Sequence, residues 1–105
     1  MILSLLVMFG CQKPDPCAAM CSIATRTLGG CIENDNLTWE DAGYHDAQDF
    51  FHSCETWAWA SRKLEEDAGA QGMTTKTCET WESEIESSTF TCEDFHALGW
   101  NTSPW

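Results

Sequence analysis

The sequence predicts an all-α fold, a small bundle of three to four helices stapled by disulfides. Cysteine and apolar residues recur at intervals of three and four, and no segment shows the sustained alternation of a strand. Seven cysteines in 105 residues are typical of a small domain that depends on disulfides. The length allows one compact domain.

The first helix is expected from about residue 15 to residue 28. The pair Gly29-Gly30 follows and predicts its end, because glycine commonly closes a helix. A polar loop is then expected over residues 33–36. The positions that share one face of this helix, at i, i+4, i+7 and i+11, are Cys17, Cys21, Ala24 and Leu28.

The longest helix is expected over about residues 45–68. Thr38 and Asp41 precede it in a variant capping box, with Asp in place of the usual Glu or Gln. Gly43 separates that first turn from the main segment. The residues that line one side at a 3.6-residue period are Ala47, Phe50, Cys54, Trp57, Ser61 and Leu64.

A third helix is expected over about residues 75–87, with Cys78, Trp81 and Ile85 on one stripe. Thr91 and Asp94 repeat the capping pattern before a short fourth helix. The expected core is thin, and its main candidates are Leu28, Phe50, Phe51, Trp57, Leu64, Trp81, Ile85, Phe95 and Leu98.

Residues 1–10 form an apolar run that is too short to span a membrane and matches the core of a secretory signal. The small residue Gly10 stands directly before Cys11, and this arrangement resembles the lipobox of bacterial lipoproteins. The resemblance implies that Cys11 is lipidated and anchors the mature chain to a membrane. Gln12, a residue other than Asp after that cysteine, implies the outer membrane of a double-membraned bacterium.

The organisation expected from these features is a signal peptide over 1–10, a tether over 11–16 and a cysteine-rich helical domain over 17–105. A plain cleaved signal and a secreted protein remain alternatives. The glycosylation sequons at Asn36 and Asn101 keep a eukaryotic secreted origin open.

With Cys11 lipidated, six cysteines remain and three disulfides account for them. The Cys-x-x-Cys pairs typical of zinc knuckles and redox motifs are absent from the sequence. If the three main helices alternate in direction, the helix rise places matching cysteines at the same level. The predicted pairs are Cys17–Cys78, Cys21–Cys54 and Cys31–Cys92.

A candidate metal site lies on the expected outer face of the second helix. Asp41, His45, Asp49 and His52 follow one another at helical intervals, and imidazoles with carboxylates can hold zinc or copper. The ligands singled out are His45, Asp49 and His52. The alternative is a solvated polar face. No cofactor is expected.

Tryptophan offers a second candidate site. Trp59 falls on the polar side of the second helix beside Glu55, and Trp39 lies near its start. An exposed indole among acidic residues can anchor a protein partner or stack on a sugar ring. The alternative is that each indole folds back over the thin core. Two further tryptophans, Trp100 and Trp105, lie in the carboxyl-terminal tail.

The net charge of −12 argues against nucleic acid as a partner, because phosphate binding needs clustered Lys and Arg. The sequence lacks Gly-x-Ser-x-Gly, His-Glu-x-x-His and phosphate-cradling glycine loops, so we expect no enzyme. The expected function is a non-catalytic, exported, lipid-anchored interaction module. The alternatives are a metal- or carbohydrate-binding protein that uses the outer face of the second helix, and a small hydrolase.

Overall fold

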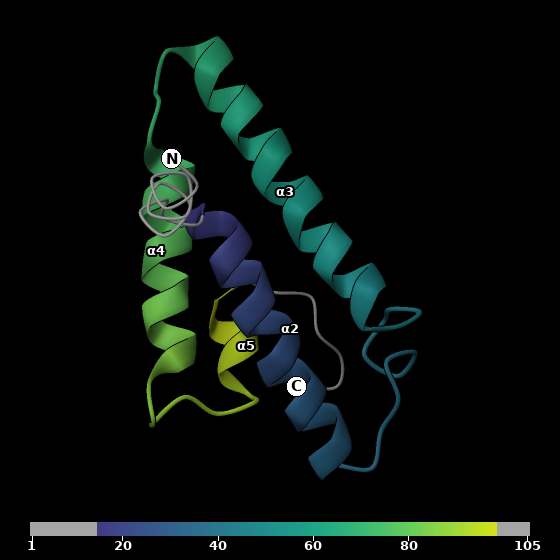
Figure 1. Ribbon diagram of the computed structural model, residues 1–105. Coiled ribbons are helices and arrows are strands. Elements are labelled where there is room, and N and C mark those ends of the chain that lie inside the picture. Colours follow the sequence, from purple (N-terminus) through teal and green to yellow (C-terminus); the bar gives the residue numbers. More distant parts are fainter. Residues whose placement is uncertain (1–14, 99–105) are drawn as a thin grey trace, which may run out of the picture.

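The computed structural model describes residues 15–98, apart from the side chains of His96 and Ala97, and over this range it is all-α, as expected (Figure 1). Residues 1–14, with the expected signal peptide and Cys11, lie outside the described residues, as do Trp100, Asn101 and Trp105. The helices are α2 (Pro16–Asn34), α3 (Ala47–Ala68), α4 (Met73–Glu86) and α5 (Asp94–Ala97).

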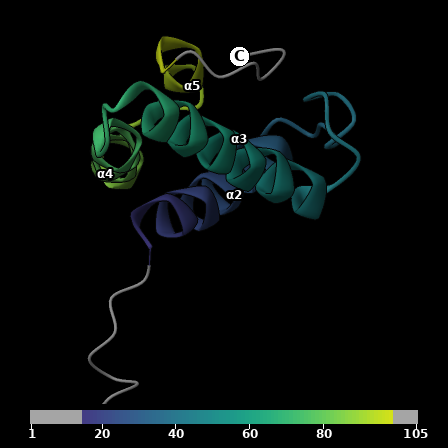
Figure 2. The same ribbon diagram turned by 90° about the horizontal axis from the view of Figure 1, so that it is seen from above.

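Helix α2 packs against both α3 and α4, which are joined by the short turn 69–72. That turn lies at the end of the molecule where α2 begins (Figure 1). Seen from above, α2 and α5 lie on opposite sides of α3 (Figure 2). Among the described helices, α3 itself packs against α2 and α4.

Helix α2 does not end at Gly29-Gly30 as expected, but continues to Asn34. Each helical glycine costs about 1 kcal/mol relative to alanine. Burial of Cys31 and Ile32 in the extra turn outweighs that cost. At the other end, Asp15 caps the helix and Pro16 is its first residue, so Pro16 belongs to α2 rather than to the tether expected over 11–16.

Helix α3 begins and ends close to the expected positions. Asp46 caps it by accepting a hydrogen bond of 2.8 Å from the Asp49 amide, and Gly69 closes it at φ 71°. The predicted capping box also forms. The Thr38 amide donates to the Asp41 carboxylate at 2.9 Å, and the Asp41 amide donates to the Thr38 hydroxyl at 3.2 Å. It closes a separate turn rather than the helix itself.

The remaining helices differ from expectation by a few residues at most. Helix α4 begins at Met73, two residues before the expected start, and ends at Glu86. The Thr91 amide donates to the Asp94 carboxylate at 2.8 Å, ahead of the single turn of α5.

Three disulfides join the helices, in the pairing expected from the helix lengths. Cys17–Cys78 links α2 to α4, with the Cα atoms 4.9 Å apart. Cys21–Cys54 links α2 to α3 at a Cα separation of 5.7 Å. Cys31–Cys92 links α2 to the segment before α5 at 5.9 Å. Helix α2 thus carries one end of every disulfide.

The core is small and is filled mainly by Met20, Leu28, Phe50, Phe95 and the buried disulfides. The prediction that Trp57 and Leu64 belong to the core is wrong, because these side chains are 36% and 70% exposed. The buried face of α3 instead runs through Phe50, Cys54 and Ala58. Ala58 presents a small side chain on this face, while the neighbouring Trp57 stacks on Trp81 of α4 with ring centroids 5.0 Å apart.

Candidate functional site

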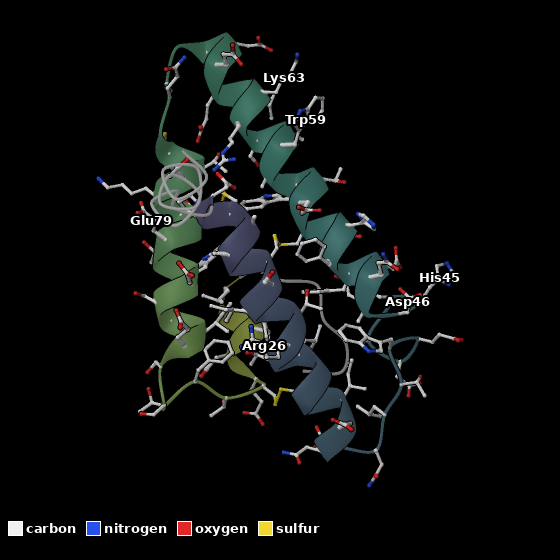
Figure 3. All side chains as sticks on the ribbon, viewed as in Figure 1. Arg26, His45, Asp46, Trp59, Lys63 and Glu79 are labelled. Atoms are coloured by element: carbon white, nitrogen blue, oxygen red, sulfur yellow. A yellow bond between two sulfur atoms is a disulfide. The ribbon has the colours of Figure 1, made fainter. Side chains whose placement is uncertain are left out.

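The structure does not gather the predicted metal ligands on one helical face. Helix α3 begins at Ala47, so Asp41 and His45 precede it. The Asp49 carboxylate accepts a hydrogen bond of 2.9 Å from the His45 backbone amide, while the His45 ring points away from the domain (Figure 3). Among the described side chains, which leave out His96, no three of His, Cys, Asp or Glu converge as metal ligands.

His52 has a different neighbour. Its Nδ1 atom lies 3.9 Å from Glu55 Oε1, and the two side chains are 66% and 44% exposed. An exposed pair at this distance contributes little to stability. His52 and Glu55 are therefore available to a ligand.

Trp39 is part of the fold rather than a free anchor. It is half-buried, and its ring centroid lies 5.8 Å from that of Phe50. A Cβ atom on Gly29 would lie 3.4 Å from the indole, so this helical glycine lets Trp39 pack closely on α2.

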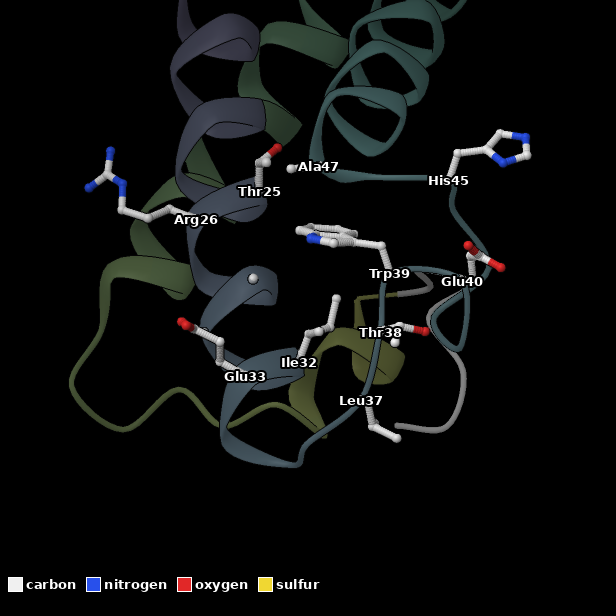
Figure 4. Close-up of a pocket in the computed structure, with 12 residues that line it drawn as sticks. Thr25, Arg26, Ile32, Glu33, Leu37, Thr38, Trp39, Glu40, His45 and Ala47 are labelled. Carbon is white, nitrogen blue, oxygen red and sulfur yellow. The ribbon is translucent and has the colours of Figure 1, made fainter.

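Trp39 also lines a broad pocket of about 760 Å³ between α2 and the segment that leads into α3 (Figure 4). The charged side chains at its rim diverge: Arg26 and Glu33 extend to one side of α2, and Glu40 and His45 extend to the other (Figure 4). A specific ligand site needs polar groups that converge on one point. This pocket does not provide that convergence.

Trp59 stands out from the middle of α3 and is 66% exposed, in agreement with its polar neighbours in the sequence. The Lys63 ammonium lies 5.7 Å from the centre of its ring, within the range of a cation–π contact. Both side chains project from the same side of the helix (Figure 3). The predicted exposure of Trp59 is thus present in the structure.

A shallow depression of about 380 Å³ lies against Trp59, and we call its lining the Trp59 shelf: His52, Glu55, Thr56 and Trp59. The other side of the indole borders a smaller depression of about 170 Å³, which Asp15, Ala18 and Arg62 also line. The indole is therefore accessible from both sides and stands between imidazole, carboxylate and hydroxyl groups.

The depression on the other side of Trp59 is bordered by polar contacts that sequence reasoning missed. The Arg62 guanidinium lies 2.7 Å from the Asp15 carboxylate and 3.2 Å from the Thr75 hydroxyl, which joins α3 to the starts of α2 and α4. The hydrogen bond from Arg62 lowers the pKa of Asp15, and the Ala18 amide adds to this effect. Asp15 and Arg62 are 47 residues apart, so no local pattern indicates the pair.

A second polar contact holds α3 to α4. The Glu65 carboxylate accepts hydrogen bonds from the Thr74 amide and, at 2.6 Å, from the Thr74 hydroxyl. Thr74 is only 5% exposed, so its hydroxyl is satisfied where water has little access. The carboxylate of Glu65 thereby caps the first turn of α4, which has no side-chain cap of its own.

The described chain belongs to the class of small, disulfide-rich, all-α domains. Disulfides of this kind form and persist in oxidising compartments. None of the helices in residues 15–98 combines the length and apolarity that crossing a membrane requires. In comparisons with known proteins, no family model, curated protein or solved structure matches the chain.

Proposed function

We propose that the protein is an exported, non-catalytic interaction module, held to a membrane by lipid on Cys11, which binds a partner through the Trp59 shelf. The observation that carries the proposal is the 66% exposure of Trp59 on a helix that is fixed in place. A large indole left in water loses hydrophobic stabilisation, and burial against a partner recovers it.

The scaffold beneath Trp59 favours binding because it is rigid. Cys54 joins this part of α3 to α2, Ala58 is buried beside the indole, and Arg62 ties the next turn to Asp15. A partner that binds here orders few additional side chains, so less of the interaction energy is lost to entropy.

The exposure of the carboxylates beside the pocket and the shelf supports a non-catalytic role. Glu33 and Glu40 at the pocket, and Glu55 at the shelf, are all exposed to solvent. General acid catalysis by a carboxyl group relies on a site that keeps it protonated, usually through burial. A small hydrolase, the third alternative, gains no support from this arrangement.

A carbohydrate is the second candidate partner, on the same shelf. The indole offers a flat apolar face, and His52, Glu55 and Thr56 around it can hydrogen-bond the hydroxyl groups of a sugar. A metal partner has less support, because His45 and Asp49 lie apart from the shelf.

The test compares Trp59→Ala with Leu64→Ala, which removes an equally exposed apolar side chain from another side of the same helix. Both variants should keep the helical circular dichroism of the parent. We expect the parent and Leu64→Ala to cross-link one protein from the host envelope through residues 52–59, and Trp59→Ala to lose it.

A glycan array probed with the same three proteins tests the carbohydrate alternative. Sugar binding that disappears only in Trp59→Ala would identify that partner class. Equal capture and equal sugar binding by all three proteins would contradict the role proposed for the shelf. Intact mass of the protein from its host tests the lipid on Cys11 separately.

A further inference from the structure

The turn between α3 and α4 exposes apolar side chains that the proposed function does not use. We call residues 62–76 the hairpin tip: the last turns of α3, the turn 69–72 and the start of α4. Two of its side chains, Leu64 and Met73, are 70% and 65% exposed. The other large hydrophobic residues exposed within residues 15–98, Trp57 and Trp59, lie just before the tip on α3.

The hairpin tip is also electrically neutral in a strongly acidic protein. It contains three basic residues and three acidic ones, so the whole net charge of −12 lies elsewhere in the chain. The basic residues are Arg62, Lys63 and Lys76. The rest of the protein would be repelled by an anionic surface, whereas the tip would not.

The chain enters the domain beside this tip. Asp15 caps α2 and bonds to Arg62, at the end of α2 that lies nearest the turn (Figure 1). Cys11 is four residues earlier, and four extended residues span at most about 14 Å. Beyond Arg62, α3 continues for six residues to Ala68, which extends the tip roughly 9 Å past this junction.

These lengths leave little room between the tip and an anchor at Cys11. The headgroup layer on each side of a bilayer is about 6 Å thick. With the lipid of Cys11 in the bilayer, the tip is therefore within reach of the headgroups when the turn 69–72 faces the membrane. Neutral charge, exposed Leu64 and Met73, and flanking lysines suit that layer, because lysine can place its ammonium near phosphate while its stem lies among apolar groups.

We propose that the hairpin tip rests in the headgroup layer of the membrane that holds Cys11, with Leu64 and Met73 immersed. This inference rests on the lipid anchor of the proposed function. Trp59 lies five residues before Leu64, about 8 Å along the helix, and projects from another side of it. The membrane and the partner thus occupy different surfaces of α3.

Methionine oxidation tests this contact at a single residue. Met1 and Met8 belong to the expected signal peptide, which leaves Met20 and Met73 in the mature chain. Met20 is 0% exposed and serves as the internal reference. The lipidated protein in vesicles of phosphatidylethanolamine and phosphatidylcholine, and a Cys11→Ser chain mixed with the same vesicles, are treated with chloramine-T, a charged oxidant that stays in water.

We expect Met73 oxidation to be at least about fivefold slower in the lipidated protein, which corresponds to a docked population of about four-fifths or more. Leu64→Glu should restore the fast rate. Gln48→Glu is the matched control, because it adds the same charge at an exposed position of α3, about 24 Å away, and should keep Met73 protected.

The outcomes separate this inference from the proposed function. A lipidated protein whose Met73 oxidises as fast as in Cys11→Ser would overturn the membrane contact and leave the anchor intact. A chain without lipid on Cys11 would overturn both the anchor and the contact. Protection of Met73 that rises with protein concentration in the absence of vesicles would instead show that a second copy covers the tip.

Discussion

The Arg62 guanidinium and the Asp15 carboxylate, 2.7 Å apart, join the last turns of the longest helix to the residue that caps α2. Asp15 also caps α2 by accepting a hydrogen bond of 3.1 Å from the Ala18 amide. One carboxylate therefore fixes both the start of α2 and its position against α3. Asp15 is also four residues after Cys11, so the segment from the proposed anchor joins the domain here.

The pair should stabilise the fold in a pH-dependent way. The hydrogen bond from Arg62 lowers the pKa of Asp15 in the folded state below its ordinary value of 3.8. The ionised carboxylate therefore stabilises the fold at pH values above 3.8, and this stabilisation is lost as the pH falls through the lower, folded-state pKa. Both side chains are more than a third exposed, so we expect Arg62→Gln to cost at most about 1 kcal/mol at pH 7.

Urea unfolding of the parent and Arg62→Gln at pH 7 and pH 2.5 measures this contribution. The difference between the two proteins should be present at pH 7 and shrink at the lower pH. Asp15→Asn provides the control, since asparagine keeps the helix cap while the ion pair is lost. A difference that is the same at both pH values would contradict the assignment to Asp15.

Glycine substitutions should have opposite effects at two positions. A Cβ atom on Gly30 would meet nothing within 4 Å, and Gly30 lies inside α2, so Gly30→Ala should stabilise by about 0.5–1 kcal/mol. Gly69 has φ 71°, which an alanine adopts poorly, so Gly69→Ala should destabilise. Chemical denaturation measures both; destabilisation by Gly30→Ala would argue that α2 does not continue through the glycines.

The face of α3 that packs on α2 can be tested by size. Ala58 is 4% exposed, so Ala58→Leu should overpack the α2–α3 contact and cost about 1–3 kcal/mol. Leu64→Gln changes a side chain that is 70% exposed, and we expect less than about 0.5 kcal/mol. Thermal unfolding of the two variants tests which face of α3 is buried. If the face with Trp57 and Leu64 were the buried one, Leu64→Gln would be the costly change and Ala58→Leu the mild one.

Reduction should unfold the domain, because the core is small and each native disulfide in such a domain contributes about 2–5 kcal/mol. Loss of Cys17–Cys78 should cost more than loss of Cys31–Cys92, since Cys78 is 0% exposed whereas Cys92 is half-buried before a single-turn helix. Paired Cys→Ala variants measured by circular dichroism test the order. A helical spectrum that survives excess reductant would contradict the dependence on disulfides.

The sequence predicted the helices and their covalent links because these follow from local periods and helix length. Cys17, Cys21 and Cys31 lie on one face of a helix whose rise sets their levels, and this is sufficient to match them to their partners. The predicted end of α2 was wrong because the poor helix propensity of glycine is only a local preference. Burial of Cys31 and Ile32 overrides it.

The candidate site was predicted only in part, for similar reasons. Trp59 has polar neighbours on its own helical face, so its exposure could be expected. Trp57 and Ala58 lie on adjacent stripes of α3, and hydrophobicity alone favoured the larger residue. The choice of Ala58 depends on how closely α2 approaches, which the sequence of α3 does not contain.

All three disulfides have one cysteine in α2, and this has a consequence for biogenesis. In the export that we propose, the cysteines of α2 would emerge first, and their partners Cys54, Cys78 and Cys92 would follow later. An oxidase that joins thiols in order of appearance would link Cys17 to Cys21, which is non-native. Only thiol–disulfide exchange, which an isomerase accelerates, would convert such a link to the native pairing.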